Sequence, residues 1–276
     1  MDRLGLMKIG IYVDVSNIAQ NGGYGMHYDI LRAFACRNHG VAVRLNAYVA
    51  YDEEEAKFNN DYKKKSMNFH STLRDYGYKV IVKKVKWYED ESGRRFGKAN
   101  ADLDMAVDAL TQSDRLDYVL LVTGDGDFVQ VIRALQNKGC RVEVIGFKNV
   151  AHSLKREADV LTSGYLVPGL LPSLTKKDNH ENWGDVNSRV RGVCYAFNHD
   201  KGYGFMRFMN RLHGEVWITD SRKRQSPYET AFVHHSQIPD NIDLNELPNR
   251  AQIFEFSLEN GEKGVQAVDL EEIYHY

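Results

Sequence analysis

The chain has 276 residues, of which 43% are hydrophobic, and a formal net charge of −2. This length allows two domains, and this composition is ordinary for a soluble globular protein. The charge excludes a uniformly basic nucleic-acid binder, so a polyanionic partner would have to be bound by local clusters of positive charge. No apolar run approaches the roughly 20 residues of a membrane span, so we expect no membrane partner and a cytoplasmic location.

The first third of the chain alternates predicted strands with predicted helices. Strands are expected at 8–15, 41–50 and 78–85, and helices at 30–37 and 59–76, the second with Phe58, Tyr62, Phe69 and Leu73 facing inward. The first strand ends in Asp14, which Ser16 and Asn17 follow in a turn. An acidic residue therefore stands where a buried strand stops.

A basic cluster follows in the same region, and it has two interpretations. Its members are Lys63, Lys64, Lys65, Lys83, Lys84, Lys86, Arg94, Arg95 and Lys98. They would form a surface that tracks phosphates, or they are a solvated helix face and a charged loop, since charge runs alone are weak signals. Residues 89–97 show no pattern of regular structure.

The segment 99–110, ANADLDMAVDAL, is predicted to be a mostly buried helix, because it is apolar on two sides. Asp102 lies near its start on an inward stripe, whereas Asp104 and Asp108 lie four residues apart on an adjacent face. Asp102 would reach a site at the strand ends, or it simply favours the first turn of its helix electrostatically. The site role is less favoured for the other two acids.

The central stretch 117–137, DYVLLVTGDGDFVQVIRALQN, predicts a buried strand, a tight turn and a helix. Gly124 and Gly126 would let the backbone turn sharply and leave Asp125 and Asp127 at the carboxyl end of the strand, where open α/β sheets usually hold their sites. The alternative is that Asp127 caps the helix and Asp125 favours the turn.

A further strand at 140–147 and a short helix at 153–158 complete the pattern of a parallel sheet covered by helices on both faces. Residues 171–188 have the composition of a linker. After it come short strand-like runs at 189–197, 202–208, 215–218, 231–235 and 252–257. We therefore predict a first domain at 1–170 and, at 189–276, a small all-β barrel, which leaves few exposed edges.

The four acids Asp14, Asp102, Asp125 and Asp127 match a site for a hard cation, because carboxylate oxygens suit Mg²⁺ or Mn²⁺. At this point the motifs carry a family resemblance. YVDVSN (12–17), ADLDMAVD (101–108), LLVTGDGDF (120–128) and AHSLKREAD (151–159), taken in order, resemble an NYN domain, a branch of the PIN-like nucleases. The resemblance covers roughly residues 7–170, and the ordered set is far more specific than any one motif.

The NYN resemblance implies a metal-dependent endoribonuclease, with the four acids as both metal ligands and catalytic residues and Asn17 beside them. One departure is the pair Ala99-Asn100, where many relatives have Lys-Gly; Lys98 lies one position earlier. The family also includes members without catalytic activity.

The second domain resembles a cold-shock domain, an OB-fold barrel, through FNHDKGYGFM (197–206), AFVHHSQI (231–238) and EKGVQAVDL (262–270). The resemblance implies that outward rings stack on bases of a single strand and that a lysine faces phosphate. By position the implied residues are Lys201, Tyr203, Phe205, Phe232, His234 and His235. Two departures are Ala196, where the family has an exposed tryptophan, and an insertion at about 209–230 that carries Arg222, Lys223 and Arg224.

The sequence thus predicts a PIN-like α/β domain followed by a cold-shock-like OB-fold barrel, and a Mg²⁺- or Mn²⁺-dependent endoribonuclease that cleaves single-stranded RNA held by the barrel. The leading alternative is a catalytically inactive RNA-binding adaptor. A third class is a metal-dependent phosphatase or a nuclease acting on single-stranded DNA.

Overall fold

The computed structural model describes residues 6–90, 92–173, 183–262 and 264–275. The chain divides into two compact units, one formed by residues 1–24 and 39–162 and the other by residues 25–38 and 163–276. No helix among the described residues is long and apolar enough to cross a membrane. The predicted domain limits, 1–170 and 189–276, stay a prediction, and the predicted linker at 171–188 falls largely outside the described residues.

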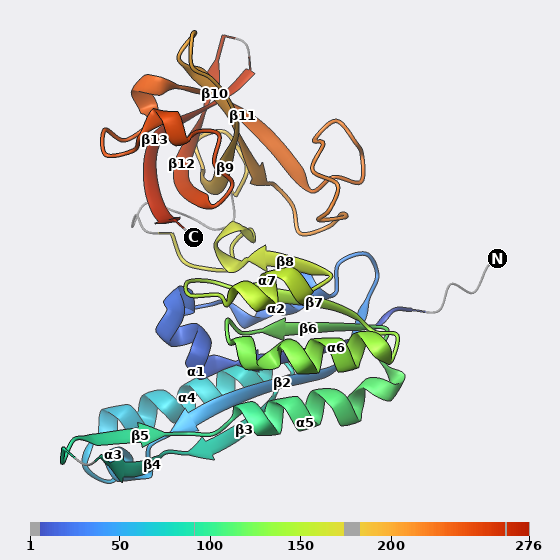
Figure 1. Ribbon diagram of the computed structural model, residues 1–276, viewed down its shortest axis with the longest axis vertical. Helices are drawn as coiled ribbons and strands as arrows, with labels where there is room; N and C mark the ends of the chain where they lie inside the picture. Colours follow the sequence, from blue (N-terminus) through green and yellow to red (C-terminus); the bar gives the residue numbers. More distant parts are fainter. Residues whose placement is uncertain (1–5, 91, 174–182, 263, 276) are drawn as a thin grey trace. The chain divides into compact units, whose positions relative to one another are not determined.

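In the described part of the first unit the core is a six-stranded sheet in the order β3-β2-β1-β6-β7-β8 (Figure 1). Its strands are β1 (Lys8–Asp14), β2 (Val41–Tyr51), β3 (Lys79–Lys84), β6 (Tyr118–Val122), β7 (Arg141–Gly146) and β8 (Val160–Ser163). The neighbouring strands from β3 through β7 pair in parallel. The strands β1 and β6 are buried on both faces, which explains why they are continuous apolar runs.

Helices cover both faces of this sheet (Figure 1). The α-helices of the first unit are α1 (Val15–Ile18), α3 (Glu53–Phe58), α4 (Asn60–Asp75), α5 (Asp102–Gln112), α6 (Val129–Asn137) and α7 (His152–Glu157). Shorter turns of helix are η1 (Ala19–Gly23), η2 (Ser113–Arg115) and η3 (Gly126–Phe128). Because the crossovers of parallel strands are right-handed, α4 lies on one face and α5, α6 and α7 lie on the other.

This topology has a switch point between its two central strands. From β1 the chain moves outward to β2 and β3, whereas from β6 it moves the other way to β7 and β8. The helices that follow β1 and β6 therefore leave on opposite faces, and ligands of open α/β sheets usually bind at the carboxyl ends of the two strands at such a point. The sequence prediction of a parallel sheet covered on both faces is confirmed.

Three sequence predictions in this unit were wrong. The helix expected to be mostly buried at 99–110 leaves Leu103 and Val107 63% and 49% exposed. Phe58, expected to face inward with Leu73, is 92% exposed, whereas Leu73 is fully buried. Phe58 ends α3 rather than entering α4, because Asn59 interrupts the two helices and its side chain caps α4. Residues 89–97, expected to lack regular structure, belong largely to an antiparallel hairpin of β4 (Lys86–Glu89) and β5 (Arg95–Lys98).

The second unit contains a closed five-stranded barrel, within the described residues, in the order β10-β11-β13-β12-β9. Its strands are β9 (Arg189–Asn198), β10 (Tyr203–Met209), β11 (Tyr228–His234), β12 (Gln252–Gly261) and β13 (Gly264–His275). The unit also holds α2 (Tyr28–Ala35), η4 (Gly164–Leu166), η6 (His235–Gln237) and η7 (Leu244–Glu246). The third and fifth barrel strands pair in parallel and the first pairs with the fourth, which is the order of an OB fold. The predicted barrel is confirmed, although residues 215–218, expected to be a strand, form none.

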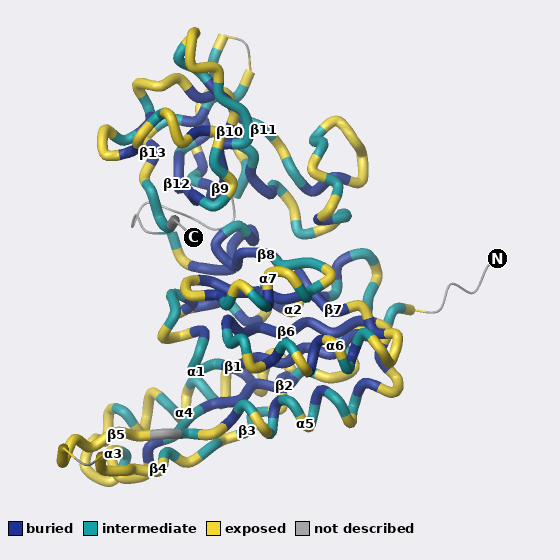
Figure 2. The backbone as a smooth tube through the Cα atoms, viewed as in Figure 1, coloured by how far each residue is buried: buried dark blue, intermediate teal, exposed yellow. Residues whose placement is uncertain are grey.

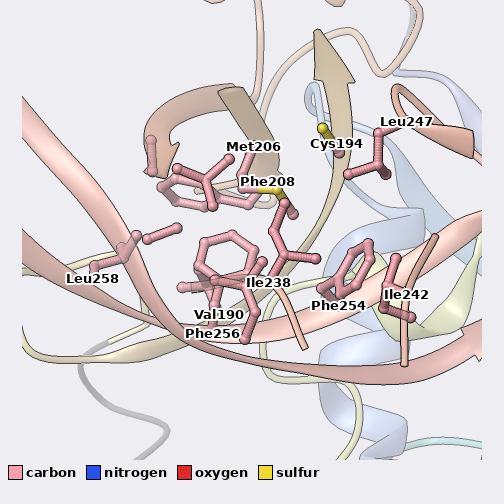
Figure 3. Close-up of a cluster of buried hydrophobic side chains, with 14 residues drawn as sticks. Val190, Cys194, Met206, Phe208, Ile238, Ile242, Leu247, Phe254, Phe256 and Leu258 are labelled. Carbon is pink, nitrogen blue, oxygen red and sulfur yellow. The ribbon is translucent and has the colours of Figure 1, made fainter. Parts of the chain in front are cut away.

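The barrel interior is an apolar cluster contributed by all five strands (Figure 3). Phe208 and Phe256 pack edge to face at its centre, with ring centroids 6.1 Å apart. A buried ion pair lies outside this cluster: Arg191 and Glu255 are 2% and 1% exposed and their charged atoms are 2.8 Å apart. Arg191 also donates to the carbonyl oxygen of Pro172 at 2.6 Å, which holds the segment preceding the barrel against β9.

We expect Arg191→Met to lower the free energy of unfolding by about 3 kcal/mol, because it removes the nearer cation from the buried Glu255 carboxylate and leaves Arg189 as its remaining ion-pair partner. Urea unfolding measures the loss, and faster hydrogen exchange in β9 and β12 assigns it to the barrel. Arg133→Met is the matched control, since its ion pair with Glu157 is solvated and should contribute little. Equal effects from the two variants would contradict the role given to the buried pair.

Candidate metal centre and nucleic-acid interface

The carboxyl ends of β1 and β6 bring acids from three parts of the first unit together. Asp14 ends β1 and is only 5% exposed, Asp102 begins α5, and Asp125 follows β6. Burial raises the pKa of the Asp14 carboxyl to about 6, the backbone N–H of Asn17 opposes this rise, and the charges of Asp102 and Asp125 add to it. A hydrogen bond between the Asp14 and Asp102 side chains raises this pKa further, so burial and both neighbouring acids oppose the ionisation of Asp14.

Asp127 lies at the outer edge of the same group. It is in η3 and is exposed, and its backbone N–H donates to Asp125 Oδ1 at 3.0 Å. A shallow hollow of about 160 Å³ is lined by Asp102, Leu103, Ala106, Asp127, Phe128 and Val131. Asp102 therefore faces both Asp14 and the hollow that contains Asp127.

Asn17 ties the two acid-bearing turns together. Its backbone N–H donates to Asp14 Oδ1 at 3.0 Å, and its side-chain Oδ1 accepts the backbone N–H of Gly124 at 2.9 Å. The sequence prediction placed Asn17 beside the acids as a catalytic residue. Its side-chain oxygen accepts from the turn after β6 and so helps to position that turn, and its catalytic role stays a prediction.

The glycines of this turn serve close packing. Sequence analysis assigned Gly124 and Gly126 to a sharp turn, but neither has a positive φ. A Cβ on Gly126 would lie 3.1 Å from Ala151 Cβ and 3.2 Å from Ser153 Oγ, and the carbonyl oxygen of Gly124 accepts the N–H of Ala151 at 2.9 Å. The start of α7 thus packs against the turn and fixes Asp125 from the side opposite Asn17.

The other acids of α5 have structural partners. Asp104 forms an ion pair with Lys83, and Asp108 accepts a hydrogen bond from the Tyr48 hydroxyl at 2.7 Å. Both pairs connect α5 to strands of the sheet. A site role for Asp104 and Asp108, less favoured from the sequence, stays untested.

The donor set at the strand ends suits a divalent metal ion, since it consists of carboxylate oxygens gathered around the buried Asp14. Among the described residues, however, no three His, Cys, Asp or Glu side chains are grouped so as to hold a metal ion. A divalent cation there would offset the mutual repulsion of these carboxylates. The chemistry of the residues therefore fits Mg²⁺ or Mn²⁺.

The second candidate site is the outer face of the barrel. Tyr203, Phe205 and Phe232 form a triangle of rings whose centroids lie 5.5 to 6.2 Å apart, and Phe205 and Phe232 are 37% and 36% exposed. Lys201 and the paired rings of His234 and His235, 4.3 Å apart, are exposed at one end of these strands. The rings lie outside the apolar cluster that fills the barrel.

Sequence reasoning missed Tyr195, which a bulge in β9 places on this face. Phe205 pairs with Ala196 and Met206 with Cys194, so Tyr195 has no cross-strand partner in β10. Its ring centroid lies 6.5 Å from that of Phe205. The space left by Ala196, where a tryptophan was expected, is thus next to another aromatic ring. No sequence signal predicts the bulge, because strict alternation would turn Tyr195 inward.

Arg207 extends the face beyond the rings, and its position two residues after Phe205 was a usable signal. Its guanidinium lies over Tyr195 and Tyr228, with Cζ 5.6 and 5.3 Å from the ring centroids. Burial lowers its pKa, and the positive charge of Arg250 lowers it further. No oxygen of the described residues accepts a hydrogen bond from this guanidinium, so its N–H donors are available to an anion. In the insertion, by contrast, Arg222 is paired with Asp220.

Comparison with known proteins identifies the first part of the chain. A family model described as NYN domain matches residues 8–167. The chain is 26% identical over 159 residues to the low amplitude and bright protein LabA of Synechococcus elongatus, an alignment that spans 55% of this chain and 81% of that protein. The crystal structure of a Vibrio parahaemolyticus protein of unknown function, VPA0982, is 26% identical, with a TM-score of 0.46 over 59% of this chain and 96% of that chain.

Burial of Asp14 gives a prediction about stability. Its pKa of about 6 lies above the ordinary 3.8, so the fold loses stability as the pH rises between these values and carries the full penalty at pH 7.5. We expect Asp14→Asn to raise the free energy of unfolding by about 1 to 3 kcal/mol in EDTA at pH 7.5, because the amide removes the charge and can still accept from Asn17. At pH 4 the difference should largely vanish.

Asp52→Asn is the matched control for urea unfolding. Asp52 is also a buried helix cap, but both of its carboxylate oxygens accept hydrogen bonds, one from the backbone N–H groups of Glu54 and Glu55 and the other from the Trp87 indole. Asparagine has only one side-chain oxygen, so it would lose at least one of these hydrogen bonds. This variant should be destabilised. If Asp14→Asn lowers the free energy of unfolding instead, the ionised carboxyl of Asp14 stabilises the fold and the prediction is wrong.

Proposed function

Because the chain belongs to the NYN domain family, we propose that it is a Mg²⁺- or Mn²⁺-dependent endoribonuclease that cleaves single-stranded RNA and holds it with its barrel. Domains of this family are in general nuclease-like hydrolases. The observation that carries the proposal is the meeting of Asp14, Asp102 and Asp125 at the switch point of the sheet. A buried group of like charges is costly unless a cation binds there, so it favours a functional site.

In this proposal each residue has a distinct task. Asp14, Asp102 and Asp125 would hold the metal ion, and the exposed Asp127 would meet it from the hollow beside α5. Asn17 keeps the turns that carry Asp14 and Asp125 at a fixed separation. A bound divalent ion supplies an activated water and neutralises charge on the phosphodiester.

The rival function is a catalytically inactive RNA-binding adaptor. It is favoured by the lack, among the described residues, of three acids already grouped around a cation position. A measurement of metal binding distinguishes the nuclease from the inactive adaptor better than an activity assay alone. Mn²⁺ should raise the melting temperature of the wild type, and Asp14→Asn should abolish that rise, because a ligand stabilises only the state that binds it. No response of the wild type would favour the adaptor.

We expect Asp125→Asn with Asp127→Asn to abolish Mn²⁺-dependent cleavage of labelled single-stranded RNA while leaving RNA affinity nearly unchanged, because the amides keep the turn and remove the charge. Gel electrophoresis with Mn²⁺ or EDTA measures cleavage. A parallel lane with single-stranded DNA tests the substrate class, and a phosphomonoester tests phosphatase activity.

The matched control for this prediction is Asp61→Asn, an exposed acid in the first turn of α4. It should cleave like the wild type. The chemistry of the RNA ends distinguishes this activity from that of a contaminating ribonuclease. Attack by an activated water leaves a 3′-hydroxyl, whereas ribonucleases that use the 2′-hydroxyl leave a cyclic phosphate. Undiminished cleavage by the double variant, with 3′-hydroxyl ends, would overturn the proposed site.

RNA binding by the barrel rests on its outward rings. Phe205→Ala and Phe232→Ala should each weaken single-strand binding by about 1 to 3 kcal/mol, the usual contribution of one ring stacked on a base. Tyr195→Ala should weaken it comparably, because its ring lies beside Phe205. We propose that Lys201, Tyr203, His234 and His235 complete this surface. Fluorescence anisotropy with a short labelled RNA measures the affinities.

Phe58→Ala controls for the loss of an exposed aromatic side chain, since Phe58 is 92% exposed in the other unit. It should bind RNA normally. Circular dichroism must show a folded barrel in every variant. If the three barrel variants stay folded and bind as the wild type does, the partner of the barrel is engaged elsewhere.

A further inference from the structure

The hairpin of β4 and β5 stands apart from the sheet of the first unit. It forms a separate two-stranded sheet in which Lys86 pairs with Lys98, Trp87 with Gly97, Tyr88 with Phe96 and Glu89 with Arg95. Figure 2 shows it as one of the most exposed parts of that unit. Cross-strand partners share a face, so Tyr88 and Phe96 lie on one side of the hairpin and Trp87 on the other.

The Trp87 side attaches the hairpin to the start of α3. The indole N–H of Trp87 donates to Asp52 Oδ2 at 3.1 Å. Arg95 forms an ion pair with Glu54 at 2.8 Å and lies over the Trp87 ring at 5.0 Å. The hairpin is therefore held through this face, and its attachment does not use the rings on the opposite face.

The opposite face, which we call the ring face, consists of Lys86, Tyr88 and Phe96. The two rings are stacked, with centroids 5.8 Å apart and an interplanar angle of 26°. They are 48% and 46% exposed. A cross-strand aromatic pair stabilises a hairpin to some degree. When the pair is half exposed and lies beside a lysine, it also offers flat surfaces on which the aromatic bases of a polyanion can stack.

The ring face opens toward the acids of the candidate metal centre. A hollow of about 410 Å³ is lined by Tyr88, Lys83, Lys84, Lys86, Asn100, Leu103 and Asp104. Leu103 also lines the smaller hollow that contains Asp102 and Asp127. The larger hollow, which Lys86 and Tyr88 of the ring face line, therefore meets the smaller hollow of the acids at Leu103.

Charge within the larger hollow is unevenly neutralised. Lys83 is paired with Asp104 and Lys84 with Glu53. Lys86, by contrast, forms no ion pair with any described residue. Its ammonium group is therefore the one most available to a phosphate next to the two rings.

We propose that the ring face is a second binding element for single-stranded RNA, in which Tyr88 and Phe96 stack on bases and Lys86 contacts the backbone, so that the strand passes Leu103 to the acids. The identity of the ligand rests on the proposed function. Alternating rings and cations favour a single strand over a protein segment, because every base presents an aromatic face and every linkage a negative charge.

The test uses the full chain in EDTA, where binding is read without cleavage, and a background of Phe205→Ala with Phe232→Ala to reduce binding by the barrel. Tyr88→Val with Phe96→Val removes the aromatic faces and retains residues that favour strands. We expect about tenfold weaker binding of a short single-stranded RNA. Photocrosslinking of a 5-iodouridine RNA to the unmodified chain should label the peptide that contains Tyr88 or Phe96.

Tyr24→Val is the matched control, because Tyr24 is 84% exposed and lies outside the hairpin. It should bind as the background does. Unchanged affinity of the folded double-valine variant, with no crosslink in residues 86–98, would overturn the proposal, as would a hairpin that captures a protein segment and no RNA. A wild type that binds RNA at the hairpin but never cleaves it would overturn only the proposed nuclease function.

Discussion

The constraint on which the site depends is the charge of Asp14, held at 5% exposure where β1 ends. An ionised carboxyl there loses hydration and lies near Asp102 and Asp125, which is why its pKa is raised to about 6. The fold tolerates this arrangement because Asn17 donates a backbone N–H to Asp14 and holds the turn after β6 through its side chain. Packing of that turn against α7 completes the support. The buried charge of Asp14 thus lowers the stability of the fold, as is common for residues of functional sites.

Much of this first unit was predictable from sequence because parallel strands impose a simple rule. Residues that end neighbouring strands meet at one edge, so Asp14 and Asp125 could be placed together before any coordinates were known. Asp102 required only helical periodicity. The bonds of Asn17 could not be predicted, since its backbone and side chain serve two turns separated by more than 100 residues. Periodicity also failed at Phe58, where the cap at Asn59 breaks one apparent helix into two.

The barrel shows the same division between pattern and local geometry. Alternation in β10 places Tyr203, Phe205 and Arg207 on one face, and the OB order of the strands follows from closing five short strands. The bulge at Tyr195 lies beyond such reasoning, because one extra residue reverses the inward and outward assignment on one side of it. Arg207 gains its unusual surroundings from that bulge, since Tyr195 supplies one of the two rings that contact it.

A net charge of −2 and binding of a polyanion are compatible because the cations are distributed unequally. Several form ion pairs with acidic residues of their own unit. These are Lys83, Lys84 and Arg95 in the first unit and Arg222 in the second. Lys86 and Arg207, for which the described residues offer no acidic partner, each lie beside aromatic rings. Binding on such surfaces would draw more on stacking than on the release of counterions. A strand held in this way is recognised by its unpaired bases, since a duplex keeps its bases stacked on one another and offers chiefly its phosphates.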